Sequence, residues 1–406
     1  MIPLDEARSY VLGLGRPLES VEVPIWGADG LVLAEDIVAL EDVPGEDNSA
    51  MDGWGLRSAD AQAPGAELAV VGRQMAGIAD PNLTVGPGEA VRIMTGAPLP
   101  AGVDSVEMVE RATVGRADSG GETVRLELAV PEGQFVRRAG EDVTAGQRVL
   151  TAGTLLTPAG VGVGTSVGRR QVSVVRRPRV GVISTGDELV AEDRPLRPGE
   201  LRDSNRPGLL AAVARLGAEA VDLGWVPDDE ALLEAALVSG TESCDLVLTS
   251  GGVSMGDADL VKVLLARLGD MRWMQIAIKP AKPLAAGTVG DTPVVGLPGN
   301  PVSSHVSLVL FAAPLIARLA GRHDDPIARV CAALPHGLPG RPSGDGKTHF
   351  VRVLATHDDA GRWSARSAGA QGSHQLSTMS LANGLAIQPG GESIGADSTA
   401  VVLLLP

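Results

Sequence analysis

Three short segments combine glycine with hydroxyl and carboxylate side chains, and each of them follows a run of apolar residues. They are Ser184-Thr185-Gly186-Asp187-Glu188, Thr249-Ser250-Gly251-Gly252-Val253-Ser254 and Leu297-Pro298-Gly299-Asn300-Pro301. Glycine lets backbone N–H groups approach an anion closely, and a helix that begins after such a loop adds the positive end of its dipole. A single loop of this kind is usually a tight turn, whereas three at one sheet edge indicate a ligand that carries phosphate.

Acidic residues recur at or near the same turns. They are Glu188, Asp228, Asp257 and Asp259, with Asp52 and Asp142 in the first half of the chain. Carboxylate oxygens are the ligands that Mg²⁺ prefers, and this ion commonly bridges carboxylates and substrate phosphates. Asp228 and Asp257 also have a purely structural interpretation, because both are placed to cap the N-termini of helices. Zinc is not expected, because the chain has no cluster of histidine and cysteine.

Two lysines lie in the segment Ile278-Lys-Pro-Ala-Lys-Pro283, where the prolines stiffen the backbone. Lysines at a protein surface are common and need no function. In a chain with a net charge of −16, however, Lys279 and Lys282 held beside anion-binding loops would attract an oxyanion.

Two further motifs resemble catalytic signatures. Residues 252–256 match G-x-S-x-G, which makes a hydrolase that uses Ser254 an alternative, although the preceding double glycine indicates a flexible loop rather than a strained elbow. Gly346-Lys347-Thr348 resembles the end of a Walker A motif. Arg341 occupies the position of its first glycine and a strand-like run follows, so this segment is predicted to be a turn that leads into a strand.

The elements that position these loops alternate between strand and helix. Apolar runs predict strands at 180–184, 220–226, 245–249, 275–278 and 294–297, and helical periodicity predicts helices at 206–216, 229–238, 258–268 and 302–319. This alternation is typical of a doubly wound parallel sheet, in which ligands bind beyond the carboxyl ends of the strands.

The rest of the chain is predicted to be mostly β, apart from a short helix at 4–15. Glycine- and proline-punctuated runs fill 21–175, and strands are expected at 328–333, 349–354, 385–388 and 400–405. We therefore predict a multidomain α/β plus β protein. Its parts are a linker domain at 1–45 and 140–175, an inserted β-rich domain at 46–139, the α/β domain at 176–325 and a small β-barrel at 326–406.

Composition excludes several classes of protein. The 406 residues include 34 Lys and Arg against 50 Asp and Glu, and only 2% are aromatic, which argues against nucleic-acid binding. Two cysteines, Cys244 and Cys331, exclude a disulfide framework. The N-terminus lacks the layout of a signal peptide, and the apolar stretch at 308–317 is too short to span a membrane. We predict a cytoplasmic protein with neither nucleic-acid nor membrane partners.

Seven segments, taken in order, resemble the molybdopterin molybdenumtransferase (MoeA-type) family, which is related to the E domain of gephyrin. They are Asp47-Asn-Ser-Ala-Met-Asp52-Gly, Arg92-Ile-Met-Thr95-Gly-Ala-Pro-Leu-Pro-Ala-Gly102, Arg138-Ala-Gly-Glu-Asp142, Ser184-Thr-Gly-Asp-Glu188-Leu, Thr249-Ser-Gly-Gly-Val-Ser254, Ile278-Lys-Pro-Ala-Lys-Pro283 and Gly296-Leu-Pro-Gly-Asn-Pro-Val-Ser303. Gln371-Gly-Ser373-His and Ala382-Asn-Gly384 extend the resemblance. Trp54 stands where the family usually has Tyr, which is a conservative departure.

The resemblance implies an elongated homodimer whose α/β domain binds a pterin. The implied reaction takes adenylylated molybdopterin and molybdate, cleaves the phosphoanhydride in the presence of Mg²⁺, and yields molybdenum cofactor and AMP. It is the final step of molybdenum cofactor biosynthesis, and molybdopterin adenylyltransferase is a candidate partner for handing over the substrate. A non-catalytic pterin-binding scaffold is the other alternative that the resemblance leaves open.

The resemblance also implies roles for individual residues. The catalytic polar residues would be Asp52, Thr95, Asp142, Glu188, Asp228 and Asp259, of which Glu188, Asp228 and Asp259 would hold Mg²⁺. The pterin and its phosphate would be bound by Thr185, Gly186, Ser250, Gly251, Gly252, Ser254, Pro298, Gly299, Asn300, Pro301 and Ser303. The molybdate pocket would comprise Lys279, Lys282, Ser303, Arg352 and Ser373. In a dimer, Asp52 and Thr95 would face the pterin site of the other subunit.

Overall fold

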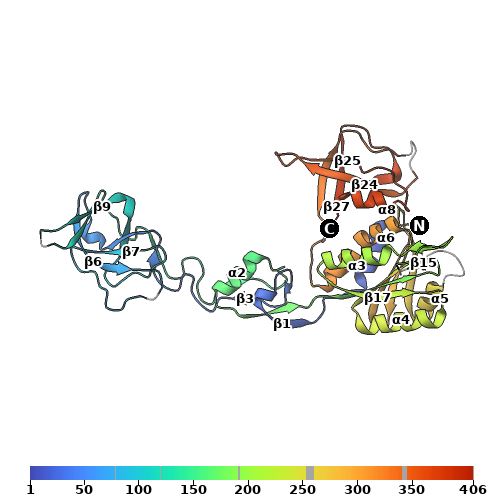
Figure 1. Cartoon of the computed structure of the whole chain (residues 1–406), viewed down its shortest axis with the longest axis horizontal. Helices are drawn as coiled ribbons and strands as arrows, with labels where there is room; N and C mark the ends of the chain where they lie inside the picture. The colour runs from blue at the N-terminus through green and yellow to red at the C-terminus, as the bar shows by residue number, and fades with distance from the viewer. Residues whose placement is uncertain (78, 119, 191–192, 253–259, 341–344, 406) are drawn as a thin grey trace.

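The chain is elongated and has a β-rich domain at one end. The structure, a computed structural model, describes residues 1–77, 79–118, 120–190, 193–252, 260–340 and 345–405. In Figure 1 a narrow linker domain connects the β-rich domain to an α/β domain, and the C-terminal domain lies beside the α/β domain. Both termini are at the α/β end of the molecule.

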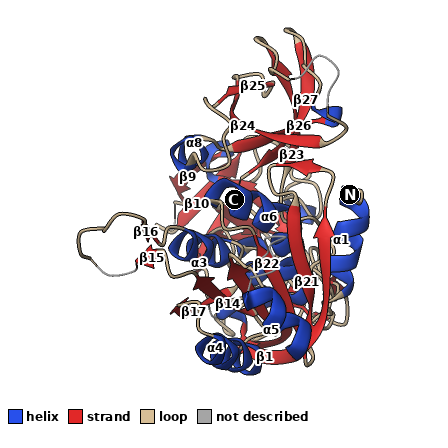
Figure 2. Ribbon diagram, turned by 90° about the vertical axis from the view of Figure 1, so that its right-hand side faces the viewer, coloured by secondary structure: helices blue, strands red, loops and turns tan. Residues whose placement is uncertain are grey.

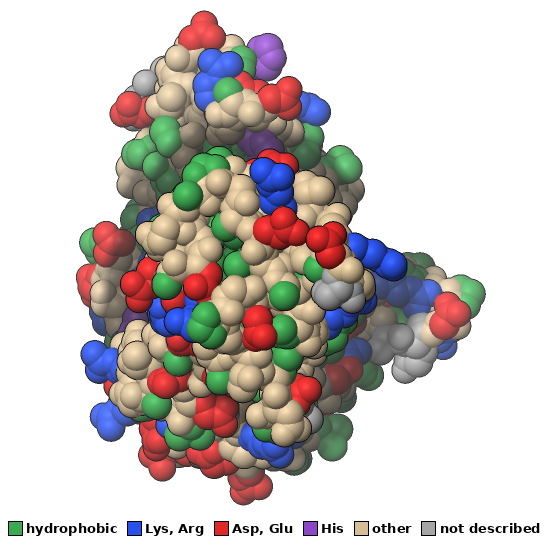
Figure 3. All heavy atoms as spheres, turned by 90° about the vertical axis from the view of Figure 1, so that its left-hand side faces the viewer, with side chains coloured by type: hydrophobic (Ala, Val, Ile, Leu, Met, Phe, Trp, Pro, Cys, Tyr) green, Lys and Arg blue, Asp and Glu red, His purple; other side chains and the backbone are tan. Residues whose placement is uncertain are grey.

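The β-rich domain is built around a six-stranded sheet with the order β8-β5-β7-β6-β10-β9. The side chains of Trp54, Leu56, Val124 and Leu126 fill its core. Its elements are β4 (Asn48–Ser49), β5 (Gly53–Leu56), η2 (Ser58–Asp60), β6 (Glu67–Gln74), β7 (Glu89–Ile93), β8 (Ser105–Met108), η3 (Val109–Arg111), β9 (Ala112–Arg116), β10 (Glu122–Leu126) and β11 (Val136–Arg137). Figure 3 views the molecule from this end and shows acidic and basic side chains interspersed, with no continuous basic area on that face.

The linker domain is formed by two stretches of chain on either side of the β-rich domain. Its elements are β1 (Ser20–Pro24), η1 (Ile25–Gly27), β2 (Val32–Leu33), β3 (Ile37–Val38), β12 (Arg148–Leu150), α2 (Pro158–Ser166) and β13 (Gln171–Val175). Helix α2 begins after Thr157, whose hydroxyl accepts a hydrogen bond from the Gly160 N–H, and Pro158 has the fixed φ that suits the first helical position. Sequence periodicity did not predict this glycine-rich helix.

The central sheet of the α/β domain has the order β17-β14-β18-β22-β21-β19. Its strands are β14 (Arg179–Thr185), β17 (Glu219–Val226), β18 (Leu246–Ser250), β19 (Gly269–Gln275), β21 (Pro283–Val289) and β22 (Thr292–Leu297). The prediction of a parallel sheet is confirmed for β17, β14, β18 and β22. The sheet is not parallel throughout: β19 and β21, the second of which was not predicted as a strand, run antiparallel to their neighbours because the connections at 276–282 and 290–291 are too short for a crossover helix.

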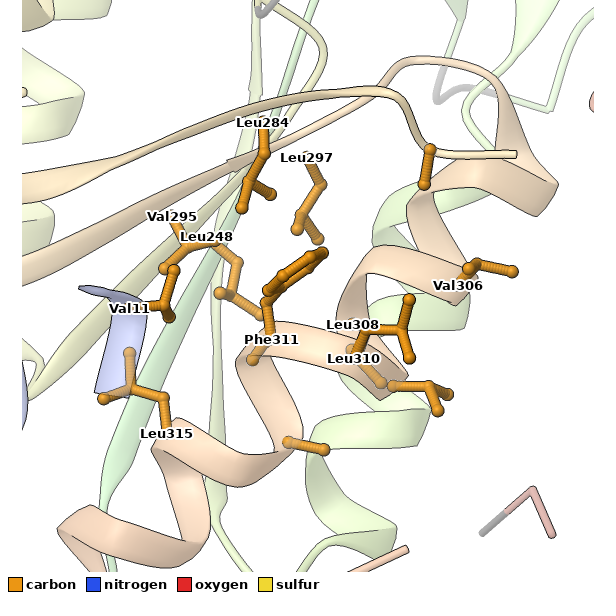
Figure 4. Packing of buried hydrophobic residues seen from close by; sticks show 14 of the residues in the cluster. Val11, Leu248, Leu284, Val295, Leu297, Val306, Leu308, Leu310, Phe311 and Leu315 are labelled. Atoms are coloured by element: carbon orange, nitrogen blue, oxygen red, sulfur yellow. The ribbon is translucent and has the colours of Figure 1, made fainter. Parts of the chain in front are cut away.

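Helices cover this sheet and supply much of its core. They are α3 (Asn205–Arg215), α4 (Glu230–Ser243), α5 (Leu260–Leu268), α6 (Pro301–Ser307), the π-helical turn η4 (Leu308–Ala312) and α7 (Ala313–Leu319). In the continuous helix from α6 to α7, Phe311 packs against the sheet close to Leu297 and Leu248 (Figure 4). This helix is long and apolar enough to cross a membrane, but 89% of its most apolar window is buried inside the protein.

The N-terminal helix α1 (Leu4–Gly13) packs with the α/β domain, although the predicted boundaries place it in the linker domain. Its residues Ala7 and Val11 are fully buried and belong to the same hydrophobic core as α7. Gly15 allows this close approach, because a Cβ there would lie 2.5 Å from Leu315 Cδ1. The other predicted domain boundaries stay a prediction.

The C-terminal domain is a closed five-stranded barrel, as predicted. Its pairings run β24-β25-β23-β27-β26 and return to β24. Its elements are β23 (Arg329–Leu334), β24 (Thr348–His357), β25 (Trp363–Ser367), α8 (Leu376–Leu381), β26 (Gly384–Gln388), η5 (Pro389–Gly391) and β27 (Ser398–Leu404). The short strand β20 (Ile278–Lys279) of the α/β domain pairs with β24 and so joins the two domains. Figure 2 shows the barrel above the α/β sheet, and β15 (Leu189–Val190) and β16 (Leu201–Arg202) at the base of a projecting arm.

Candidate active site

The loops that follow four neighbouring strands meet at one edge of the α/β sheet. Because β17, β14, β18 and β22 are parallel, their carboxyl ends lie side by side. The N–H of Gly251 donates to the carbonyl of Leu297 at 3.0 Å, and the indole N–H of Trp225 donates to the carbonyl of Gly186 at 2.8 Å. The three glycine-containing loops singled out in the sequence are therefore brought together.

Glycines let the loop backbones come unusually close at this edge. Gly251 has a φ of +102°, and a Cβ at this position would lie 3.3 Å from both the carbonyl oxygen and Oγ1 of Thr185. The position of a Cβ on Gly299 lies 3.8 Å from the Gly251 Cα. Thr185 and Ser250 beside them are buried. The result is a narrow cradle of backbone and hydroxyl groups that suits an anion.

Two predicted metal ligands lie at the ends of adjacent strands, and the third falls outside the described residues. Glu188 folds back over Gly186, where a Cβ would meet its Oε2 at 2.4 Å. The backbone N–H of Asp228 donates to Asp187 Oδ1 at 2.9 Å. Asp259 and Ser254 belong to the stretch 253–259 that the structure does not describe. Within the described residues no three His, Cys, Asp or Glu side chains group as a metal site.

The structure corrects the interpretation of Asp228 as a helix cap. The cap of α4 is Asp229, whose carboxylate accepts the N–H of Leu232 at 2.9 Å. A side chain one residue earlier lies too far along the backbone to reach that N–H group. The carboxylate of Asp228 is thus not used for capping. Together with Glu188 it gives two hard oxygen donors, which suffice for Mg²⁺ when substrate phosphates complete its coordination.

The two predicted lysines lie at the same edge of the sheet. In the antiparallel pair β21–β22, Ala285 is opposite Gly296, so continuing this register places Pro283 opposite Pro298. Lys282, which precedes Pro283, is therefore near the loop that contains Gly299. Lys279 and Lys282 are both exposed, and neither forms an ion pair with any residue in the described part of the chain.

Arg352 and Ser373 reach this edge from the C-terminal barrel. The Arg352 side chain donates to the carbonyls of Ala370 and Gly372 at 2.7 and 3.2 Å. Ser373 follows in the same loop, and its carbonyl accepts the Val302 N–H of α6 at 3.1 Å. This contact places the loop beside Ser303, which is buried in the first turn of α6.

Arg352 is a buried cation that has no counter-ion among the residues the structure describes. Only 1% of the residue is exposed, and across the described ranges no carboxylate forms a salt bridge with it. Its Nε is buried and has no partner there either. Burial lowers the pKa of the guanidinium because the charged form loses solvation. An uncompensated buried charge of this kind is expected where an anion binds.

Asp52, Thr95 and Asp142 are not brought to this edge within one chain. Asp52 directly precedes β5 and Thr95 follows β7. The β-rich domain that contains these strands lies at the opposite end of the molecule (Figure 1). Asp142 lies in the turn where the chain returns to the linker domain, with its N–H bonded to the Val43 carbonyl at 3.0 Å. The predicted residues thus form two separate groups in the chain.

Thr95 holds the Asp52 carboxylate in a fixed position and ionised. Its N–H and its hydroxyl both donate to Asp52 Oδ1, at 2.7 and 2.8 Å. These two hydrogen bonds, with a smaller effect from Arg92, lower the pKa of Asp52. The carboxylate is exposed and therefore available to a group from outside the domain.

We expect Thr95→Val to raise the pKa of Asp52 toward that of an ordinary aspartate, about 3.9. A carboxyl-carbon NMR titration measures this pKa. Because the pKa is lowered in the folded state, the associated stability is present above the unfolded-state pKa and is lost as the pH falls. The variant should therefore unfold in acid at a slightly higher pH. Thr113→Val, on exposed strand β9, is the matched control, and an unchanged Asp52 pKa would contradict the assignment.

Sequence reasoning missed one residue at the sheet edge. The Asn205 side chain donates to Ser250 Oγ at 2.8 Å and to the Gly299 carbonyl at 2.7 Å. The helix was predicted to begin at 206, which left Asn205 in the preceding loop, whereas α3 begins at Asn205 itself. A polar residue at a helix start is the signal that could have drawn attention to it.

The fold and the arrangement of loops define an α/β protein with accessory β domains and an anion-binding sheet edge. Three family models match along the chain: the MoeA N-terminal region (domain I and II) at residues 2–168, the probable molybdopterin binding domain at 181–318, and the MoeA C-terminal region (domain IV) at 340–405. Together they cover most of the 406 residues. The chain belongs to the molybdopterin molybdenumtransferase (MoeA) family.

Relatives match over nearly the whole length. The molybdopterin molybdenumtransferase of Haemophilus influenzae is 39% identical over 385 residues, which covers 94% of this chain and 93% of the relative. Molybdopterin molybdenumtransferase 2 of Mycobacterium tuberculosis is 38% identical over 395 residues, with 95% of each chain covered. A solved structure of the molybdopterin biosynthesis MoeA protein from Pyrococcus horikoshii aligns over 100% of both chains, with a TM-score of 0.82 and 28% identity.

Proposed function

We propose that this protein inserts molybdate into adenylylated molybdopterin and releases AMP, the final step of molybdenum cofactor biosynthesis. The observation that supports the proposal most is the sheet edge at which β14, β18 and β22 end. A cradle of glycine backbone and hydroxyl groups lies there, and we propose that the cations Lys279, Lys282 and Arg352 form an oxyanion pocket beside it. Relatives that are named molybdopterin molybdenumtransferase and match almost end to end support it.

The two features suit the two substrates of this reaction. The N–H groups of the glycine loops and the Ser250 hydroxyl can donate to a phosphate of the pterin substrate. Two exposed lysines and a buried arginine can balance the charge of a tetrahedral oxyanion such as molybdate. Ser303 and Ser373 lie where α6 meets the barrel loop and can donate hydroxyl protons to the same anion. The chain thereby holds the metal oxyanion next to the end of the pterin that receives it.

The carboxylates of Glu188 and Asp228 are the residues in the described chain that would hold Mg²⁺. Bound there, the ion would neutralise negative charge on the phosphoanhydride. The same carboxylates can orient the water that cleaves the anhydride and accept its proton. The Ser250 hydroxyl and the loop N–H groups hold the phosphate in place during this step.

We further propose that the active molecule is a cytoplasmic homodimer in which each site uses both subunits. In a single chain the β-rich domain, to which Asp52 and Thr95 belong, lies at the opposite end from the α/β domain (Figure 1). A two-fold axis across two elongated chains can bring the β-rich end of one to the sheet edge of the other. Asp52 would then act at the pterin site of the partner. Molybdopterin adenylyltransferase is the candidate donor of the adenylylated substrate.

Reconstitution with purified components tests the proposed function. With adenylylated molybdopterin, Mg²⁺ and molybdate, the protein should release AMP and form a cofactor that activates a cofactor-free molybdenum enzyme. Glu188→Gln should abolish both, and Glu242→Gln, on the exposed side of α4, should preserve both. Absence of AMP release from the wild-type protein would reject the proposal, and substrate binding without turnover would favour the scaffold alternative. Labelling by a fluorophosphonate that is lost in Ser254→Ala would favour the hydrolase.

A further inference from the structure

Asn205 links three elements at the centre of the candidate site. It is the first residue of α3, and its single amide nitrogen donates to the hydroxyl of Ser250 at the end of β18. The same nitrogen donates to the carbonyl of Gly299, in the loop between β22 and α6. Among the described residues it therefore spans both halves of the phosphate cradle.

The helix start that carries Asn205 is held rigidly. The Asp203 carboxylate, whose side chain is 1% exposed, accepts hydrogen bonds from the Ser184 hydroxyl at 3.0 Å and from Arg206 Nε at 2.8 Å. Arg206 also forms an ion pair with Asp222 on β17. Residues on both sides of Asn205 are thus tied to the sheet. The amide is accordingly fixed in place rather than free to sample alternatives.

The orientation of the amide follows from its partners. A carbonyl such as that of Gly299 can only accept a hydrogen bond, so the atom facing it must be Nδ2. This leaves the amide oxygen Oδ1 buried, with no partner in the part of the chain that the structure describes. An unpaired buried acceptor opposes stability. Its presence is therefore not explained by the stability of the fold, and a role in the site accounts for it.

The hydrogen bond from Asn205 determines where the Ser250 hydroxyl proton points. Ser250 is 3% exposed, and its oxygen accepts the Asn205 amide proton, so the hydroxyl proton must point elsewhere. Within the described ranges that proton has no protein acceptor. It is therefore available to a ligand oxygen at the cradle, beside the glycine loops.

We propose that Asn205 is a positioning residue for the phosphate of the bound pterin. Its amide nitrogen donates to the Ser250 oxygen and to the Gly299 carbonyl, and so fixes the position of both. The Ser250 hydroxyl proton then points toward a phosphate oxygen. This inference rests on the proposed function, because it names how that site holds its pterin substrate. The proposed role of Asn205 consists of hydrogen bonding and includes no covalent step.

A double-mutant cycle on the dissociation constant of adenylylated molybdopterin tests this role. Binding is followed by pterin fluorescence without molybdate or Mg²⁺. We expect Asn205→Ala and Ser250→Ala each to weaken binding about tenfold. The first removes the group that orients the Ser250 hydroxyl and the second removes the hydroxyl itself, so each loses the hydrogen bond from Ser250 to the charged phosphate. The double variant should also lose only about tenfold, because both changes remove the same contact. A role of Asn205 in folding alone would leave the affinity of the folded Asn205→Ala protein unchanged.

Control variants distinguish a failure of this inference from misfolding and from a failure of the proposed function. Asn82→Ala, in an exposed loop of the β-rich domain, should bind like the wild-type protein. If Asn205→Ala does not fold, as judged by urea unfolding, Asn205→Asp replaces it and should bind at least tenfold more weakly, because a carboxylate captures the Ser250 proton and repels the Gly299 carbonyl. Wild-type affinity in the Asn205 variant, or a double variant whose loss is the product of the single losses, overturns the inference. A wild-type protein that does not bind the pterin overturns the proposed function and this inference with it.

Discussion

We expect replacement of Arg352 by methionine to raise the molybdate concentration needed for half-maximal AMP release by about a hundredfold, because it would remove the buried cation that we propose binds the anion. Methionine fills a similar volume, so the barrel core keeps its packing. In the native protein the guanidinium is 1% exposed and forms no ion pair within the described chain. The measurement is the rate of AMP release as a function of molybdate concentration.

The control for this variant is Arg366→Met. Arg366 lies on the adjacent strand β25 and is exposed, so its loss should leave the molybdate requirement unchanged. The affinity for adenylylated molybdopterin should change little in Arg352→Met, which distinguishes a loss at the oxyanion from a general distortion of the sheet edge. A folded Arg352→Met protein with a wild-type molybdate requirement would contradict the assignment of this pocket.

Mixing two inactive variants restores activity if each site is built from two chains. Asp52→Asn alters the β-rich end and Glu188→Gln alters the sheet edge, and each variant alone should release almost no AMP. In a random mixture of dimers, about a quarter of the sites combine an intact β-rich end with an intact sheet edge, so about a quarter of the activity should return. The variants are co-expressed with different affinity tags, and AMP release is compared with that of the wild-type protein.

The matched control combines two changes at the same end of the chain. Glu188→Gln mixed with Asp228→Asn should recover nothing, because every sheet edge then carries one of the two substitutions. Recovery in this control, or no recovery with Asp52→Asn and Glu188→Gln, would show that the sites are not shared between subunits as proposed.

The parallel part of the sheet could be predicted because its local signals agree with the fold. Strands β14 and β18 are apolar runs that end in glycine and hydroxyl residues, and the helices between them show clear periodicity. Strand β21 was missed because its run Pro283-Leu-Ala-Ala-Gly-Thr-Val contains few β-branched or aromatic residues. Its antiparallel direction depends on tertiary packing that the spacing of residues does not encode.

The candidate site likewise has a part that could be predicted from the sequence and a part that could not. Its glycine loops could be predicted locally, since each follows its own strand. Arg352 and Ser373 come from a different domain and reach the sheet edge through the β20–β24 pairing and the contact between Ser373 and Val302. Only the resemblance to a family indicated them. Asn205 was missed because the predicted helix starts one residue later, at 206, which leaves Asn205 in the preceding loop.

Anomalous scattering at the molybdenum absorption edge, from crystals of the protein soaked in molybdate, locates the bound oxyanion. We expect one strong peak within hydrogen-bonding distance of the Lys279, Lys282 or Arg352 side chains, beside Ser303 and Ser373, and its loss in Arg352→Met. A peak elsewhere on the molecule with none at this pocket would contradict this expectation.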